Sequence, residues 1–153
     1  MPRVLLVIIS VIFVVILTGC KNNESSITTS VWKESGNVEL TTTNEKGEQI
    51  KAQWIGEQGR LAISNSPFYA GKKQKYMWLL WGDQEELVGK TLKVTAISEN
   101  GDEETIWESN LGGTNWGATA SSPSSLVLKT NGLWQLNAYV ENKLHGTIIV
   151  KVL

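Results

Sequence analysis

The most constraining feature of this chain is the two-residue period of its hydrophobic side chains. From 134 to 140 every second residue is apolar, and the pattern resumes from 144 to 152 after a turn at 141–143. This period belongs to extended strands, because a helix would repeat every 3.6 residues. It predicts a C-terminal antiparallel hairpin with one buried face. That face would carry Leu144, Gly146, Ile148, Val150 and Val152, opposite His145, Thr147, Ile149 and Lys151.

Shorter segments upstream repeat the pattern. Apolar and polar residues alternate over 92–96, and Asn100-Gly101 supplies a tight turn before a returning segment at 105–107. Residues 76–81 are apolar on both sides, which predicts a central strand covered on both faces. The other predicted strands are 38–42 and 50–54, which flank a turn at 45–48, together with 60–63 and a short strand at 126–128.

Eight or nine short strands without a long helical period predict an all-β fold. We expect an antiparallel, immunoglobulin-like β-sandwich over residues 36–153, although a small barrel would give much the same pattern. The length suits one domain with its own core. The chain has a single cysteine, so this core has no internal disulfide and depends on burial alone.

The N-terminus carries the pattern of a bacterial lipoprotein signal. Arg3 precedes an apolar run at 4–16, which ends in Leu-Thr-Gly-Cys at 17–20. The run is shorter than the roughly 20 apolar residues of a membrane-spanning helix, although an uncleaved anchor is the alternative. Removal of residues 1–19 would leave Cys20 as the N-terminus, and we expect its thiol to carry the lipid.

Lipidation of Cys20 predicts a location at the extracytoplasmic face of the cell membrane. Two acyl chains anchor a protein stably where one is marginal. Residues 20–35 are expected to form the lipidated end and a polar, flexible tether. Without Arg3, 13 of the 14 basic residues face 15 acidic ones, a net charge of about −2. This argues against nucleic-acid binding, which needs dense Lys and Arg.

The search for catalytic motifs is mostly negative, and no cofactor motif is present. His145 is the single histidine, and we expect it to be a solvated strand residue. The acidic segment 99–104 gathers oxygen ligands without the spacing of a calcium loop, so no metal site is expected. Glu85 and Glu86 would serve a glycosidase only with another carboxylate across a cleft. We therefore expect a protein that is not an enzyme.

Tryptophan is abundant, with seven residues against three tyrosines and two phenylalanines. Exposed indoles suggest stacking on sugar rings or a protein-binding hot spot, whereas buried indoles simply fill the core. Trp134 and one of Trp78 and Trp81 are expected in the core, because they lie in regular strands. Trp116 is the best binding candidate, since it lies in the glycine-rich loop 112–117.

A second loop, 66–73, joins Phe68 and Tyr69 to two lysines. It is either a recognition edge or a packed connection into the next strand. If these aromatic residues bind a partner, we expect Phe68, Tyr69 and Trp116 to be exposed and to cluster at one end of the sandwich.

Several short motifs occur together in the second half of the chain. They are Pro67-Phe68-Tyr69-Ala70-Gly71-Lys72, Gln74-Lys75-Tyr76-Met77-Trp78, Trp81-Gly82, Glu85-Glu86-Leu87-Val88-Gly89-Lys90, Pro123-Ser124-Ser125, Gly132-Leu133-Trp134-Gln135-Leu136 and the run 139–150. With them the chain resembles an uncharacterised family of lipoproteins and membrane-linked proteins from Bacillus-like Gram-positive bacteria. The resemblance implies an immunoglobulin-like extracytoplasmic domain. It implies no catalytic residue, because the family has no assigned activity.

These observations lead to three functional hypotheses. The leading one is a lipid-anchored, non-enzymatic domain that binds an envelope protein or a cell-wall polymer. The second is a protease inhibitor that presents the segment 119–123 as its loop. The third is a hydrolase of wall glycans that acts through Glu85 or Glu86.

Overall fold

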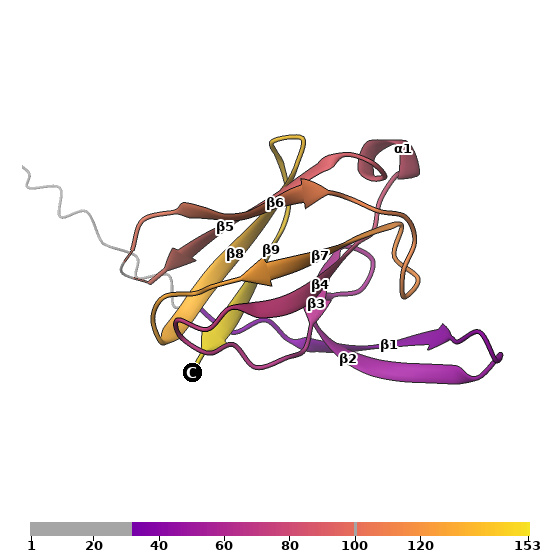
Figure 1. The fold of residues 1–153 in the computed structure, drawn as a ribbon, viewed down its shortest axis with the longest axis horizontal. Helices are drawn as coiled ribbons and strands as arrows, with labels where there is room; N and C mark the ends of the chain where they lie inside the picture. Colours follow the sequence, from indigo (N-terminus) through magenta and orange to yellow (C-terminus); the bar gives the residue numbers. More distant parts are fainter. Residues whose placement is uncertain (1–31, 100) are drawn as a thin grey trace, which may run out of the picture. The chain divides into compact units, whose positions relative to one another are not determined.

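The computed structural model describes residues 32–99 and 101–153; the predicted signal peptide and Cys20 lie outside these residues. The described part forms two antiparallel sheets (Figure 1), one ordered β1-β2-β3-β4-β7 and the other β6-β5-β8-β9. The predicted all-β sandwich is therefore confirmed. The elements are β1 (Asn37–Thr43), β2 (Gln49–Glu57), β3 (Leu61–Ser64), β4 (Gln74–Leu80), α1 (Gln84–Leu87), β5 (Thr91–Ser98), β6 (Glu104–Asn110), β7 (Ala120–Leu126), β8 (Gly132–Val140) and β9 (Lys143–Val152).

The main core fills the space between the two sheets. Every second residue of β4 points into it, and Trp78 is fully buried there beside Tyr76 and Leu80. The alternate residues of β4 face the other side, where Leu79 belongs to a second, smaller apolar cluster. The prediction that 76–81 is covered on both faces is thus confirmed. Trp134 is also buried in the main core, as expected.

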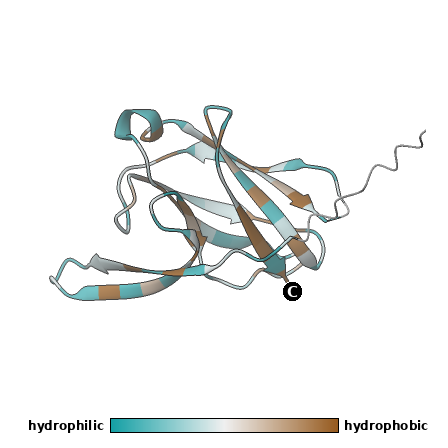
Figure 2. Ribbon diagram, turned by 180° about the vertical axis from the view of Figure 1, so that it is seen from behind, coloured by the Kyte–Doolittle hydropathy of each residue, from teal (hydrophilic) through white to brown (hydrophobic). Residues whose placement is uncertain are grey.

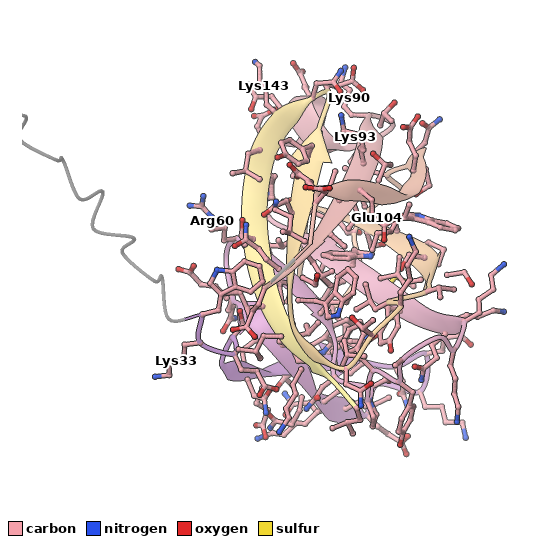
Figure 3. The ribbon with its side chains drawn as sticks, turned by 90° about the vertical axis from the view of Figure 1, so that its left-hand side faces the viewer. Lys33, Arg60, Lys90, Lys93, Glu104 and Lys143 are labelled. Atoms are coloured by element: carbon pink, nitrogen blue, oxygen red, sulfur yellow. The ribbon has the colours of Figure 1, made fainter. Side chains whose placement is uncertain are left out.

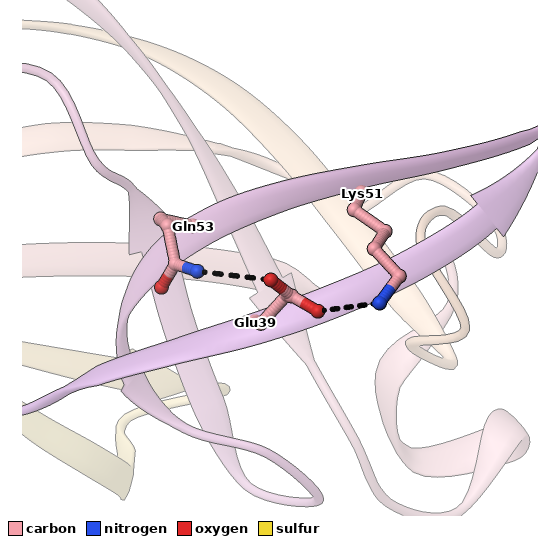
Figure 4. Close-up of polar contacts among 3 residues, drawn as sticks. All are labelled: Glu39, Lys51 and Gln53. Atoms are coloured by element: carbon pink, nitrogen blue, oxygen red, sulfur yellow. Dashed lines mark hydrogen bonds and ion pairs between the residues drawn. The ribbon is translucent and has the colours of Figure 1, made fainter.

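The β1–β2 hairpin extends beyond β3, because only residues 54–57 of β2 pair with that strand. Asn44 closes its turn by accepting hydrogen bonds from the main-chain N–H groups of Lys46 and Glu48. Hydrophobic and hydrophilic bands alternate along β2 (Figure 2). On one face Glu39 binds Lys51 at 3.0 Å and Gln53 at 3.3 Å (Figure 4). These polar contacts leave the apolar side chains to the opposite face.

The C-terminal hairpin forms as predicted, except near its turn. Glu141 and Asn142 both have positive φ angles, of 48° and 65°, which suits a two-residue turn between twisted strands. The register then shifts between Ala138 and Tyr139, so that Tyr139 pairs with Leu144. This irregularity turns Leu144 to the outside, where it is 55 % exposed. The prediction of a buried Leu144 is therefore wrong.

Strand β7 lies earlier in the chain than the predicted strand at 126–128. Its core-facing positions include Ser122 and Ser124, so the hydrophobic pattern does not mark it. Both serines are hydrogen-bonded: Trp78 Nε1 donates to Ser124 Oγ at 3.0 Å, and the hydroxyls of Ser122 and Ser109 are 2.7 Å apart. Pro123 is tolerated because β7 is an edge strand.

Helix α1 is a single turn between β4 and β5. Asp83 caps it by accepting hydrogen bonds from the main-chain N–H groups of Glu85 and Glu86. In the part of the chain that the structure describes, no helix has the length and hydropathy of a membrane span. Ser35, expected in the tether, exchanges hydrogen bonds with the main chain of Ile149 and so is attached to β9.

Candidate functional site

The outer face of the five-stranded sheet carries a cluster of indole rings. Trp54 of β2 is buried there, whereas Trp81 and Trp116 pack against the cluster and remain partly accessible. We call these three residues the tryptophan surface. Leu79 and Ala118 fill the space around them. Since Ala118 and Trp116 come from the β6–β7 connection, this connection covers part of the sheet face.

Trp116 lies at the tip of a tight turn in that connection. Asn115 and Ala118 exchange main-chain hydrogen bonds, while Trp116 and Gly117 between them have φ angles of 49° and 77°. A left-handed backbone is common for glycine but an outlier for a bulky residue, and it costs about 1–3 kcal/mol.

Two indoles hold this strained tip in place. Trp81 Nε1 donates a hydrogen bond to the main-chain oxygen of Gly117 at 2.9 Å. The ring of Trp116 meets that of Trp54 edge to face, with centroids 5.5 Å apart and an interplanar angle of 62°. The strain at Trp116 therefore persists because contacts from β2 and the end of β4 determine the conformation of the turn.

Trp54 adds an unsatisfied polar group to the tryptophan surface. It is only 5 % exposed, and its indole N–H has no hydrogen-bond acceptor among residues 32–99 and 101–153. A buried donor without a partner costs about 1–3 kcal/mol. Natural proteins satisfy nearly all such groups. The tryptophan surface therefore has two features that each reduce the stability of the fold: the strained backbone of Trp116 and the unpaired N–H of Trp54.

The binding hypothesis expected Trp116, Phe68 and Tyr69 to cluster at one end of the sandwich, but the structure separates them. Trp116 precedes β7 and the other two precede β4; since these strands are antiparallel partners, their first residues lie at opposite ends of the sheet. Tyr69 is 40 % exposed, but Phe68 is buried at 4 %. Phe68 stacks on Tyr76, with ring centroids 4.2 Å apart, and pairs with Val152 of β9. The expectation of one exposed aromatic cluster is therefore wrong.

The proposed inhibitor loop is also not a loop. Residues 120–123 belong to β7 and pair with β4, and Ser122 is buried in the core. A segment paired in this way cannot extend into a protease cleft, so the expectation for 119–123 is wrong. The small side chains of β7 allow it to pack closely against Trp78.

Glu85 and Glu86 lie on α1. They line an open depression of about 410 Å³ with Glu141, Lys90 and His145, among others. His145 Nε2 lies 3.0 Å from the main-chain oxygen of Arg60. Within residues 32–99 and 101–153, no three His, Cys, Asp or Glu side chains converge as metal ligands would.

A polar network on the outer face of the four-stranded sheet was not predicted from the sequence. Glu103, in the β5–β6 turn, accepts hydrogen bonds from Thr95, from Asn137 Nδ2 at 3.2 Å and from the Tyr139 hydroxyl at 3.4 Å. Thr95 and Asn137 are only 6 % and 5 % exposed. The donated hydrogen bonds, that of Thr95 foremost, lower the pKa of Glu103. These hydrogen bonds thus orient the carboxylate and favour its ionised form.

This network forms the floor of an open groove of about 350 Å³. The Lys93 ammonium binds Asn142 Oδ1 at 2.9 Å and lies 5.3 Å from the centroid of the Tyr139 ring. Figure 3 shows Lys93 beside Lys90 and Lys143 at one end of the four-stranded sheet. We call this depression the Glu103 groove; its lining residues are Lys93, Thr95, Glu103, Thr105, Tyr139 and Asn142.

The family described as a domain of unknown function, DUF4871, matches residues 22–150. The chain belongs to this family. The expected membership of an uncharacterised family is confirmed, and the match reaches further towards the N-terminus than the motifs from residue 66 onward suggested. Both the tryptophan surface and the Glu103 groove therefore lie inside the DUF4871 domain.

A solved structure supports the fold. The chain is similar to a candidate lipoprotein from Bacillus anthracis with a TM-score of 0.56 and 24 % sequence identity. The similarity covers 80 % of this chain and 86 % of that one. No curated protein matches the chain significantly. At this identity the similarity establishes the shared fold alone.

Proposed function

We propose that this DUF4871 protein is a lipid-anchored, extracytoplasmic binding module without catalytic activity, and that its tryptophan surface holds an envelope protein or a cell-wall polymer. One observation carries the proposal: Trp116 is held in a left-handed turn over the buried ring of Trp54. Strain of this kind concentrates at binding and active sites, where the surrounding structure maintains it.

The chemistry of the tryptophan surface suits binding. Indole rings combine a large apolar area with an N–H donor, and tryptophan is enriched among the residues that dominate binding energy. Trp81 and Trp116 are partly accessible, so their rings can contact a ligand. Tyr69, exposed at the opposite end of the sheet with Lys72 Nζ 4.9 Å from its ring centroid, would belong to a separate contact.

The N-terminus supports a location at the membrane. The Leu-Thr-Gly-Cys sequence at 17–20 follows an apolar run of signal-peptide length. The similar protein from Bacillus anthracis is described as a candidate lipoprotein, which supports the same processing here. Acyl chains such as palmitate on Cys20 would hold the domain at the membrane, and its slightly acidic net charge argues against nucleic-acid binding.

Membrane fractionation tests the anchor. In the wild-type cell, we expect the protein in the membrane fraction, with a mass that shows removal of residues 1–19 and addition of lipid. The Cys20→Ala variant should lose the lipid and change fraction or retain its uncleaved leader. An unmodified Cys20 in the mature protein would contradict the anchor.

Fluorescence quenching tests the tryptophan surface. The sample is the mature chain, residues 20–153, in which Cys20→Ser is the single substitution. Acrylamide should quench part of the tryptophan emission, and isolated cell walls or membrane extract should reduce that quenching. Trp116→Ala should abolish both the protection and the binding. The matched control is Trp107→Ala, because Trp107 is also half-buried but lies on β6 of the other sheet. Binding that survives Trp116→Ala would refute the proposed surface.

A further inference from the structure

We propose that the Glu103 groove is a second binding site, specific for a neutral polyhydroxylated ligand such as the sugar ring of a glycan. This site lies on the four-stranded sheet, whereas the tryptophan surface lies on the five-stranded sheet. It is independent of the proposed function at that surface.

The Glu103 carboxylate is organised before any ligand arrives. Thr95, Asn137 and Tyr139 all donate to the same oxygen, Oε1. These bonds fix the orientation of the side chain and leave Oε2 to accept hydrogen bonds from a ligand. An acceptor that is already oriented gains affinity, because binding does not have to order it.

Lys93 provides the complementary donor. Its ammonium group is positioned by Asn142 and by the ring of Tyr139, and it lines the same groove as Glu103. One positive and one negative group give the residues that line the groove a formal charge of zero, so the lining itself offers no net charge to an ion. A hydroxyl group both donates and accepts hydrogen bonds, so neighbouring hydroxyls on a sugar ring match this pair.

A buried polar network lies beneath the groove. Asn137 is almost completely buried on the outer side of its sheet, and its Oδ1 accepts hydrogen bonds from Gln135 at 3.0 Å and Thr147 at 2.9 Å. Buried polar groups need all their partners and are costly when one is lost. This network connects β8, β9 and the β5–β6 turn, and its outermost member is the carboxylate that faces the groove.

The test uses the mature chain carrying Cys20→Ser, titrated with neutral oligosaccharides and followed by amide chemical shifts. The probes are maltohexaose, cellohexaose and chitohexaose. We expect at least one of them to shift the amide signals around Lys93, Glu103 and Tyr139. Glu103→Gln should weaken binding tenfold or more, because the amide keeps an acceptor for the three donors but presents an N–H₂ group where Oε2 accepted.

A matched control and a second variant make the result decisive. Glu104→Gln changes the neighbouring carboxylate, which pairs with Lys129 outside the groove, and should leave binding unchanged. Lys93→Met removes the donor and keeps the aliphatic stem, so it should weaken binding even if Glu103→Gln disturbs the turn. Three results would overturn the proposal. The first is no shift with any probe at millimolar concentration, and the second is shifts confined to the tryptophan surface. The third is that Lys93→Met and Glu103→Gln both bind the probe as tightly as the unsubstituted groove does. Loss of wall binding in Trp116→Ala would not affect it.

Discussion

Replacement of Gly56 by alanine should destabilise the sandwich severely. Gly56 lies in β2 opposite Ala62, with a φ angle of 130° that side chains rarely adopt. A Cβ atom at this position would lie 2.3 Å from the main-chain oxygen of Leu61 and 2.9 Å from the Cα of Ala62. Both are backbone atoms of the neighbouring strand, so no side-chain rotation can relieve the contact.

The magnitude follows from two contributions. The unfavourable backbone conformation costs about 1–3 kcal/mol. Displacement of a packed strand to accommodate the methyl group costs about another 1–3 kcal/mol. Together they amount to about 2–6 kcal/mol of a total stability of about 5–15 kcal/mol. At about 4 °C per kcal/mol for a domain of this size, Gly56→Ala should lower the Tm by roughly 8 °C or more.

Two other glycines separate the contributions when unfolding is followed by circular dichroism. Gly36 has no atom within 4 Å of an added Cβ and no positive φ angle, so Gly36→Ala should stay within about 0.5 kcal/mol of wild type. Gly47 has a φ angle of 80° but open space around it, so Gly47→Ala should lose about 1–2 kcal/mol from backbone strain alone. If Gly56→Ala unfolds at the same midpoint as Gly47→Ala, the steric part of this reasoning is refuted.

Three further predictions concern buried or fixed polar groups. Ser124→Ala leaves the buried Trp78 N–H without its acceptor and should cost about 1–3 kcal/mol in urea unfolding, whereas an unchanged midpoint would contradict this. Burial raises the pKa of Tyr76 to about 12. A spectroscopic titration should show one tyrosine that ionises at this higher pH, and Tyr76→Phe should remove that transition. The free energy of unfolding should fall as pH rises above the usual tyrosine pKa of about 10. Hydrogen-bond donors lower the pKa of Glu103 in the folded state. The ionised carboxylate therefore contributes its full stabilisation above the usual glutamate pKa of about 4.3, and this stabilisation is lost as pH falls through the lower folded pKa. Glu103→Gln should flatten the dependence of Tm on pH in that acid range.

The fold was predictable wherever one face of a strand meets the core with apolar side chains. This holds for β8, for most of β9 and for the doubly covered β4. It fails for β7, whose core-facing serines satisfy the indole of Trp78 and the hydroxyl of Ser109 from other strands. Hydrophobic periodicity predicts the burial of apolar side chains. It cannot predict a buried serine whose hydrogen-bond partner is far away in the sequence.

The candidate sites were less predictable, because the exposure of a side chain depends on what covers it. Phe68 and Trp116 both lie in connections, yet Phe68 is buried by Tyr76 and the end of β9, whereas Trp116 stays partly accessible on the ring of Trp54. Loop position and aromatic character are the same for both residues. The sequence alone therefore could not distinguish the partly accessible Trp116 from the buried Phe68.

The Glu103 groove shows the same limit from the polar side. Alternation along β8 places Asn137 on the face away from the core, where a polar residue is expected to be solvated. Instead Glu103, 34 residues earlier, lies over it and excludes water. A two-residue period assigns each side chain to a face of its sheet, but whether that face is open depends on a turn from another part of the chain. On each outer face of this sandwich, a connection that lies over the strands creates the candidate site. Neither site could therefore be predicted from the sequence pattern of its strands alone.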